Sequence, residues 1–138
     1  MVIRDSNGIM LAARCITKMG CLNLAVVEAL AVLVSFQLCR ESGIRRVQFE
    51  GDAKGVIDVV LLDEVDRGWM GHVIADTKQE LQEFEDKLIT FVKRDGNRVA
   101  AYILAKSAAK VVLNNTSHIT PPDCISDSLV LEQLALVD

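Results

Sequence analysis

The stretch that most constrains the fold runs from residue 23 to residue 60. Residues 24–39 are apolar on nearly every face of a helical projection, which predicts a largely buried helix. Gly43 is a plausible stop signal just past this helix. Residues 45–50 (RRVQFE) alternate in part and predict a short strand, and the residues from Ala53 onward predict a second helix. A helix, a strand and a helix in close order indicate an α/β fold.

Two carboxylates occupy unusual places in this stretch. Glu28 interrupts the apolar segment, where a carboxylate is costly to bury unless it is paired or binds a metal ion. Asp52 stands at the end of the predicted strand. Plainer interpretations remain open, because Glu28 can pair with an arginine and Asp52 can cap the helix that follows it. Glu50 lies on the same strand face as Asp52 and is interpreted as a solvated or paired acid.

The segments before and after this stretch predict further elements. Residues 1–4 and 9–17 flank the turn sequence Asp5-Ser6-Asn7-Gly8, which predicts a β-hairpin. Two prolines at positions 121 and 122 exclude regular structure around them. The other predictions are a loop over 63–71, a helix over 72–84, a strand over 87–93, a turn over 94–96, a helix over 98–113 capped by Asn97, and a loop or tail over 114–127.

Composition narrows the class of protein. A chain of 138 residues fits one domain with a sizeable core, and a hydrophobic content of 51% argues against disorder. A net charge of −4 argues against a basic protein that coats nucleic acid, although a local basic patch is compatible with it. The four cysteines lack metal-finger spacing and predict reduced thiols in an intracellular protein. The apolar run is too short and too interrupted to span a membrane, and the N-terminus lacks the layout of a signal peptide.

Four motifs in a fixed order carry a resemblance to a known family. They are VIRDSNGIMLAA, AVVEALAVLVSFQLCRESG, RRVQFEGDAKGVIDVV and LITFVKRDGNRVAAYILAKSA. In this order they resemble the ribonuclease H superfamily, and most closely the plant reverse-transcriptase-like domains. The resemblance covers about residues 1–112, and PPDCI at 121–125 resembles the tail of plant members. It implies an RNase H-like domain over 1–113 with a mixed sheet, followed by a C-terminal tail over 114–138.

The resemblance also implies a site. In the family, a Glu early in the first long helix and an Asp at the end of the following strand are metal ligands, which places these roles on Glu28 and Asp52. Hydrolysis of a phosphodiester by two Mg²⁺ ions needs hard oxygen ligands that hold the ions about 3.5–4 Å apart. The implied activity is endonucleolytic hydrolysis of RNA in RNA–DNA hybrids. Arg94 and Asn97 are the candidates for contact with the nucleic acid, although a solvated basic face is the plainer interpretation of Arg94.

The chain departs from the family pattern at two ligand positions. The family's first catalytic Asp lies on a central strand upstream of the hairpin, whereas Met1 begins where the second strand would already run, so an N-terminally truncated domain is expected. The fourth acid is replaced by Ala101 or Tyr102, depending on the direction of counting. Two of four acids predict impaired hydrolysis. The alternatives are a degenerate, non-catalytic binding module and a truncated gene product.

The expected loss of the central strand has a structural consequence. It leaves either a gap of roughly 10 Å, about two strand spacings, between residues 1–17 and the strand at 45–50, or direct pairing of these elements. Open sheet edges expose unpaired backbone groups, which predicts self-association or poor solubility.

Overall fold

The computed structural model describes residues 1–16, 23–62, 68, 70–97 and 115–118. The chain falls into two compact units, which are described separately. The first consists of residues 1–18 and 97–138, and the second of residues 19–96. The described strands form two separate sheets, one in each unit, so direct pairing of the hairpin with the strand at 45–50, one of the two expected arrangements, is not found among the described strands.

The first unit contains the predicted hairpin. Strands β1 (Val2–Arg4) and β2 (Met10–Cys15) pair antiparallel, with Val2 opposite Ala13. The side chain of Asp5 accepts hydrogen bonds from the backbone N–H groups of Asn7 and Ile9, both at 2.9 Å. Gly8 has a φ of 78°, which costs glycine little because it has no Cβ. The turn chemistry expected from residues 5–8 is therefore confirmed.

A third strand in this unit corrects the prediction of a loop over 114–127. Strand β5 (Asn115–His118) pairs antiparallel with the second edge of β2, with Ala12 opposite His118. Its sequence, NTSH, lacks the apolar alternation that marks a half-buried strand. The available edge of β2 decides the conformation here, because strand formation depends more on tertiary pairing than on intrinsic propensity.

The long helix of the second unit begins where it was predicted and runs two residues past the predicted end at residue 39. Helix α1 (Leu24–Glu41) begins where the Asn23 side chain accepts a hydrogen bond from the backbone N–H of Ala25 at 2.9 Å. It ends at Ser42, and Gly43 follows with a φ of 74°. The asparagine cap and the positive-φ glycine are standard helix-terminating features, which confirms the stop signal read at Gly43.

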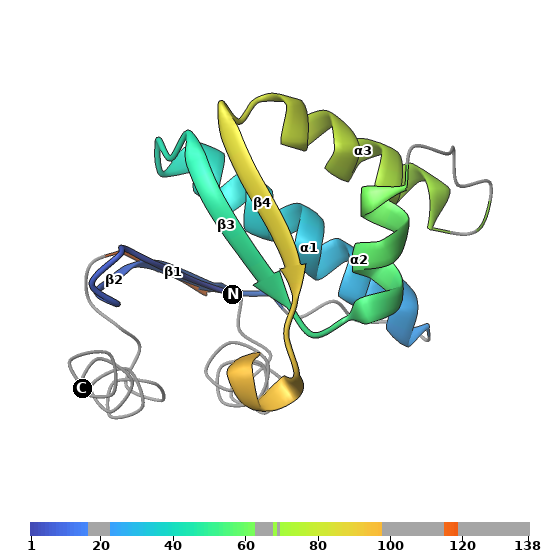
Figure 1. The fold of residues 1–138 in the computed structure, drawn as a ribbon, viewed down its shortest axis with the longest axis horizontal. Coiled ribbons are helices and arrows are strands. Elements are labelled where there is room, and N and C mark those ends of the chain that lie inside the picture. Colours follow the sequence, from blue (N-terminus) through green and yellow to red (C-terminus); the bar gives the residue numbers. More distant parts are fainter. Residues whose placement is uncertain (17–22, 63–67, 69, 98–114, 119–138) are drawn as a thin grey trace. The chain divides into compact units, whose positions relative to one another are not determined.

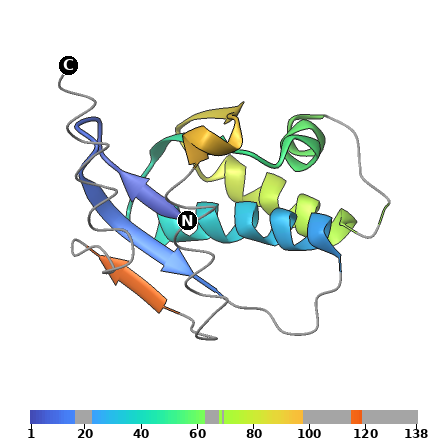
Figure 2. The same cartoon turned by 90° about the horizontal axis from the view of Figure 1, so that it is seen from below.

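The other elements of the second unit also fall close to their predicted places. Strands β3 (Arg46–Gly51) and β4 (Asp86–Phe91) form a parallel pair, and α2 (Lys54–Leu61) and α3 (Gly71–Gln82) lie between them in sequence. Helices α1 and α3 pack side by side on one face of this strand pair (Figures 1 and 2). The α/β class predicted from the 23–60 stretch is therefore confirmed.

Three phenylalanines join the helices to the sheet. Phe36 of α1 is fully buried, with 0% of its surface exposed. Its ring centroid lies 5.0 Å from that of Phe49 in β3 and 5.6 Å from that of Phe84, which links α3 to β4. Tilted and edge-on ring pairs at these distances stabilise a core beyond the area that they bury. This cluster fixes α1 against the sheet.

The remaining sequence predictions concern residues outside the two sheets and their helices. The helix predicted over 98–113 lies outside the described residues, as does most of the loop predicted over 63–71. A short 3₁₀ helix, η1 (Arg94–Asn97), occupies the turn predicted at 94–96. Cys15 and Cys39 are free thiols. Among the helices that the structure describes, none is long and apolar enough to cross a membrane.

Candidate functional site

The carboxyl-terminal edge of the β3–β4 pair gathers the polar residues of interest. Gly51 and Phe91 are opposite each other at the ends of the two parallel strands. The backbone N–H of Val92 then donates to the Gly51 carbonyl at 2.9 Å, which extends the ladder one step beyond the strands. Asp52 follows Gly51 directly and Arg94 is the third residue after Phe91, and parallel strands deliver such residues to the same edge. In α/β sheets this edge is where ligands commonly bind.

Asp52 and Arg94 form an ion pair at this edge. Nε of Arg94 donates to Oδ2 of Asp52 at 3.3 Å. The side chain of Asp52 is 19% exposed, whereas that of Arg94 is 78% exposed. The carboxylate is therefore half-sheltered and the guanidinium reaches it from solvent. The sequence motif identified both residues but not this contact.

The structure also tests the interpretation of Asp52 as the N-cap of the helix that follows it. The N-cap of α2 is Ala53, and no side chain makes a capping hydrogen bond there. The expectation that Asp52 caps this helix is therefore wrong. An uncapped first turn costs about 1 kcal/mol relative to a capped one. The Asp52 carboxylate forms its ion pair with Arg94.

Gly51 positions Asp52 by close packing. A Cβ at Gly51 would lie 2.9 Å from Cε1 of Phe49 and 3.2 Å from Cδ1 of Ile57. Real Cβ atoms are essentially never found at 2.9 Å, and 3.2 Å is an unusually tight contact, so a side chain at position 51 would force the ring of Phe49 or the side chain of Ile57 to shift. This close approach fixes the end of β3, and with it the residue that follows.

We expect Gly51→Ala to lower the free energy of unfolding by about 1–3 kcal/mol, since an added methyl forces apart a packed contact. Urea denaturation followed by circular dichroism measures it. Gly55→Ala is the matched control, because nothing lies within 4 Å of a Cβ at Gly55, which is in the first turn of α2. Alanine is the better helix former there, so Gly55→Ala should not destabilise the protein. Equal changes in the two variants would contradict the packing argument.

Glu28 lies in the second turn of α1 and is half-buried. Among the described residues its carboxylate has no hydrogen bond or ion pair, so the expected pairing with an arginine stays a prediction. Helix α1 and strand β3 run in opposite directions (Figure 1) and touch through Phe36 and Phe49.

The contact between Phe36 and Phe49 allows the positions of Glu28 along α1 and of Asp52 along β3 to be compared. Glu28 precedes Phe36 by about 12 Å of helical rise, and Asp52 follows Phe49 by about 10 Å of strand. The two carboxylates therefore stand at similar heights along α1 and β3. Their close approach at a shared ion stays a prediction.

The described residues offer few ligands for a metal ion. Carboxylate oxygens are the ligands that Mg²⁺ prefers, and the guanidinium at Asp52 marks a position where this edge accommodates positive charge. In the part of the chain that the structure describes, however, no group of three or more acidic, histidine or cysteine side chains could hold a metal ion. Asn97 ends η1, and Ala101 and Tyr102 lie outside the described residues.

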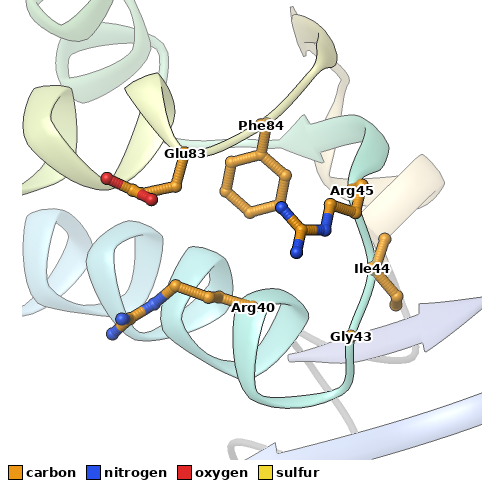
Figure 3. Close-up of a pocket in the computed structure, with 6 residues that line it drawn as sticks. All are labelled: Arg40, Gly43, Ile44, Arg45, Glu83 and Phe84. Carbon is orange, nitrogen blue, oxygen red and sulfur yellow. The ribbon is translucent and has the colours of Figure 1, made fainter.

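A small cavity lies at the opposite end of the same two strands. It has a volume of about 150 Å³ and is lined by residues that precede β3 and β4 (Figure 3): Arg40, Gly43, Ile44, Arg45, Glu83 and Phe84. Helices α1 and α3 both end beside this cavity. The cavity is thus separate from the edge that carries Asp52.

Comparison with known proteins identifies one family. The model of the family described as "Reverse transcriptase-like" matches residues 1–108 of the chain. No curated protein matched the sequence, and no solved structure did. The matched residues include both candidate carboxylates and the Arg94 turn.

Proposed function

Since the chain belongs to the reverse transcriptase-like family, which implies an RNase H-like nucleic-acid hydrolase domain, we propose that it binds RNA–DNA hybrids and hydrolyses their RNA strand slowly in the presence of Mg²⁺. The observation that carries this proposal is the family match over residues 1–108. The position of Asp52 at the carboxyl-terminal edge of β3 supports it. The likeness to plant members in particular remains a prediction from the sequence.

In this proposal Glu28 and Asp52 hold the ion, while Arg94 and Asn97 contact the phosphate backbone. Mg²⁺, when bound, supplies Lewis-acid stabilisation of charge on the phosphate and activates water. The two carboxylates bring the negative charge and the fixed geometry, and Gly51 holds Asp52 in place. Arginine suits the phosphate contact because its planar guanidinium can donate two parallel hydrogen bonds.

The slow hydrolysis that we propose follows from the small negative charge that the site offers to the metal ions. Two carboxylates contribute −2 against +4 for two Mg²⁺ ions, whereas the family arrangement uses four acids. Mg²⁺ gives up its waters reluctantly, so a second ion with few protein ligands is weakly held. The proposed site therefore holds one ion well enough for binding and lacks the second for fast hydrolysis.

The experiment that tests this function measures binding and cleavage on one substrate. A labelled RNA–DNA hybrid is titrated with the full chain, and binding is followed by fluorescence anisotropy with and without Mg²⁺. RNA products are then resolved on a denaturing gel. We expect binding to the hybrid and slow, Mg²⁺-dependent release of RNA fragments. Absence of both binding and cleavage would refute the proposal.

A second candidate function is a non-catalytic binding module. The specific observation in its favour is the Asp52–Arg94 ion pair, because a carboxylate already matched by a guanidinium has less need of a metal ion. Hybrid binding that is independent of Mg²⁺, with intact RNA after prolonged incubation, would favour this module over the slow nuclease.

We also propose that the chain associates with itself through open strand edges. Among the described residues, β1 and β3 each have a strand partner on one edge only. Exposed edges of this kind pair with other strands. We expect light scattering after size-exclusion chromatography to give a mass that rises with protein concentration. A single mass of 15.1 kDa across the concentration range would contradict this expectation.

A further inference from the structure

Strand β3 uses only one of its two edges to pair with β4 (Figure 1). The carbonyl oxygens of Phe49 and Gly51 accept hydrogen bonds from the β4 side. Because the backbone groups of successive residues in a strand point to opposite edges, the N–H and C=O groups of Arg46, Gln48 and Glu50 face away from β4. Among the described strands, none pairs with this edge.

We propose that this open edge of β3 binds the same edge of a second copy of the chain, antiparallel and centred on Gln48. The two copies of the β3–β4 pair would then form one continuous sheet. The inference rests on the self-association through open strand edges proposed above, and it adds the edge and the register.

The backbone geometry suits this register. With Gln48 opposite Gln48 of the second copy, Arg46 of each copy lies opposite Glu50 of the other. In an antiparallel pair, residues that point to the shared edge and stand directly opposite exchange both of their N–H···O bonds. The three residues that face the open edge therefore form roughly six backbone hydrogen bonds across the two-fold axis.

The side chains of the same three residues are complementary in charge. They are exposed, on the opposite face of the strand from Phe49, whose ring packs on α1. The register sets the guanidinium of Arg46 opposite the carboxylate of Glu50 in the other copy, and the two-fold axis creates this pair twice. Opposite charges directly across antiparallel strands stabilise their pairing. Arg46 already lies 3.2 Å from Oδ2 of Asp86 in β4, and its five N–H donors allow it to pair with both carboxylates.

The other described edge strands lack this complementarity. The only charged residues of β4 are Asp86 and Lys87, which are neighbours in sequence and so lie on opposite faces of the sheet. A two-fold antiparallel pair therefore never sets one opposite the other. Strands β1 and β5 have three and four residues, and neither contains an acidic residue. The charge argument therefore selects β3 among the described edges.

Charge reversal on the full chain tests the register. Light scattering over a range of protein concentrations gives the dissociation constant, and circular dichroism shows whether each variant is folded. We expect Arg46→Glu and Glu50→Arg each to weaken association by roughly ten-fold or more, because like charges then stand opposite each other. The two changes shift the net charge in opposite directions, so net charge alone cannot explain a loss in both. The double variant Arg46→Glu/Glu50→Arg should restore association.

Asp86→Asn is the matched control for these variants. It removes the partner of Arg46 on the β4 side and leaves the open edge of β3 unchanged. We therefore expect the dissociation constant of Asp86→Asn to equal that of the wild type.

Amide hydrogen exchange tests the same edge without any substitution. The N–H groups of Arg46, Gln48 and Glu50 should exchange more slowly as the concentration of the wild-type chain rises. Those of Val47 and Phe49 point to β4 and should exchange at the same rate at every concentration. Exchange at positions 46, 48 and 50 that does not depend on concentration, in a chain that associates, would overturn the inference.

The outcomes separate this inference from the proposed self-association. A single mass at every concentration would refute both. A mass that rises with concentration but has the same dissociation constant in all variants would place the association at another edge and overturn only the inference about β3. Weak association in the double variant would show that the register centred on Gln48 is wrong.

Discussion

Phe36→Ala should lower the free energy of unfolding by about 3–5 kcal/mol, which is a large part of the stability of a typical domain. Phe36 has no exposed surface and contacts the rings of Phe49 and Phe84. Its removal leaves a cavity between α1, β3 and the start of β4, and it abolishes two aromatic contacts at once. Urea denaturation followed by circular dichroism gives the value directly.

Phe91→Ala is the matched control for this prediction. Phe91 ends β4 in the same strand pair, but 43% of its surface is exposed. Its loss should cost clearly less than the loss of Phe36, since less surface returns to water. A difference of less than about 1 kcal/mol between the two variants would show that the three-ring cluster is not the core of this unit.

The order of elements in the second unit could be predicted because each one carries a local signal. The apolar run at 24–39 is long enough to distinguish a helix from a strand, and Asn23 and Gly43 mark its ends. The hairpin depends in the same way on Asp5 and Gly8, whose turn chemistry is local. Side chains that form hydrogen bonds with backbone groups close to them in the chain can be recognised from the sequence alone.

Strand β5 and the ion pair at Asp52 could not be predicted in this way, because both depend on distant partners. NTSH becomes a strand only against the free edge of β2, about a hundred residues earlier in the chain. Arg94 meets Asp52 only because β3 and β4 are parallel and in register at Gly51 and Phe91. The sequence analysis singled out both residues of the pair, but it assigned Asp52 to a metal ion and Arg94 to the nucleic acid.

The sequence also could not decide whether Asp52 caps α2 or pairs with another residue. An aspartate before a helix is a strong N-cap signal, and the sequence left that interpretation open. The structure places the cap one residue later, at Ala53, because the end of β3 is held by the packing at Gly51. The Asp52 carboxylate instead pairs with Arg94, a residue 42 positions later in the chain.

Asp52→Asn should abolish the slow, Mg²⁺-dependent hydrolysis of the hybrid, with a loss of at least about 100-fold. Changes to groups that merely support metal ligands already cost about 10–100-fold in metal affinity or activity, so the loss of a direct ligand should cost at least as much. With only Glu28 and Asp52 to hold the ion, one carboxylate would remain, and it would hold Mg²⁺ weakly. Gel analysis of RNA products against time measures the rate.

The control for this prediction is Asp86→Asn, which removes an exposed carboxylate from the far end of the same strand pair. It changes the net charge equally, and it should leave the rate of hydrolysis unchanged. Both variants should remain folded, because each removes one ion pair whose guanidinium is exposed to solvent, and such a pair contributes little to stability. Hybrid affinity in the absence of Mg²⁺ should also persist in Asp52→Asn, since the proposed phosphate contacts come from Arg94 and Asn97. Cleavage that survives Asp52→Asn would place the chemistry elsewhere in the chain, whereas equal loss in both variants would indicate a general effect of charge.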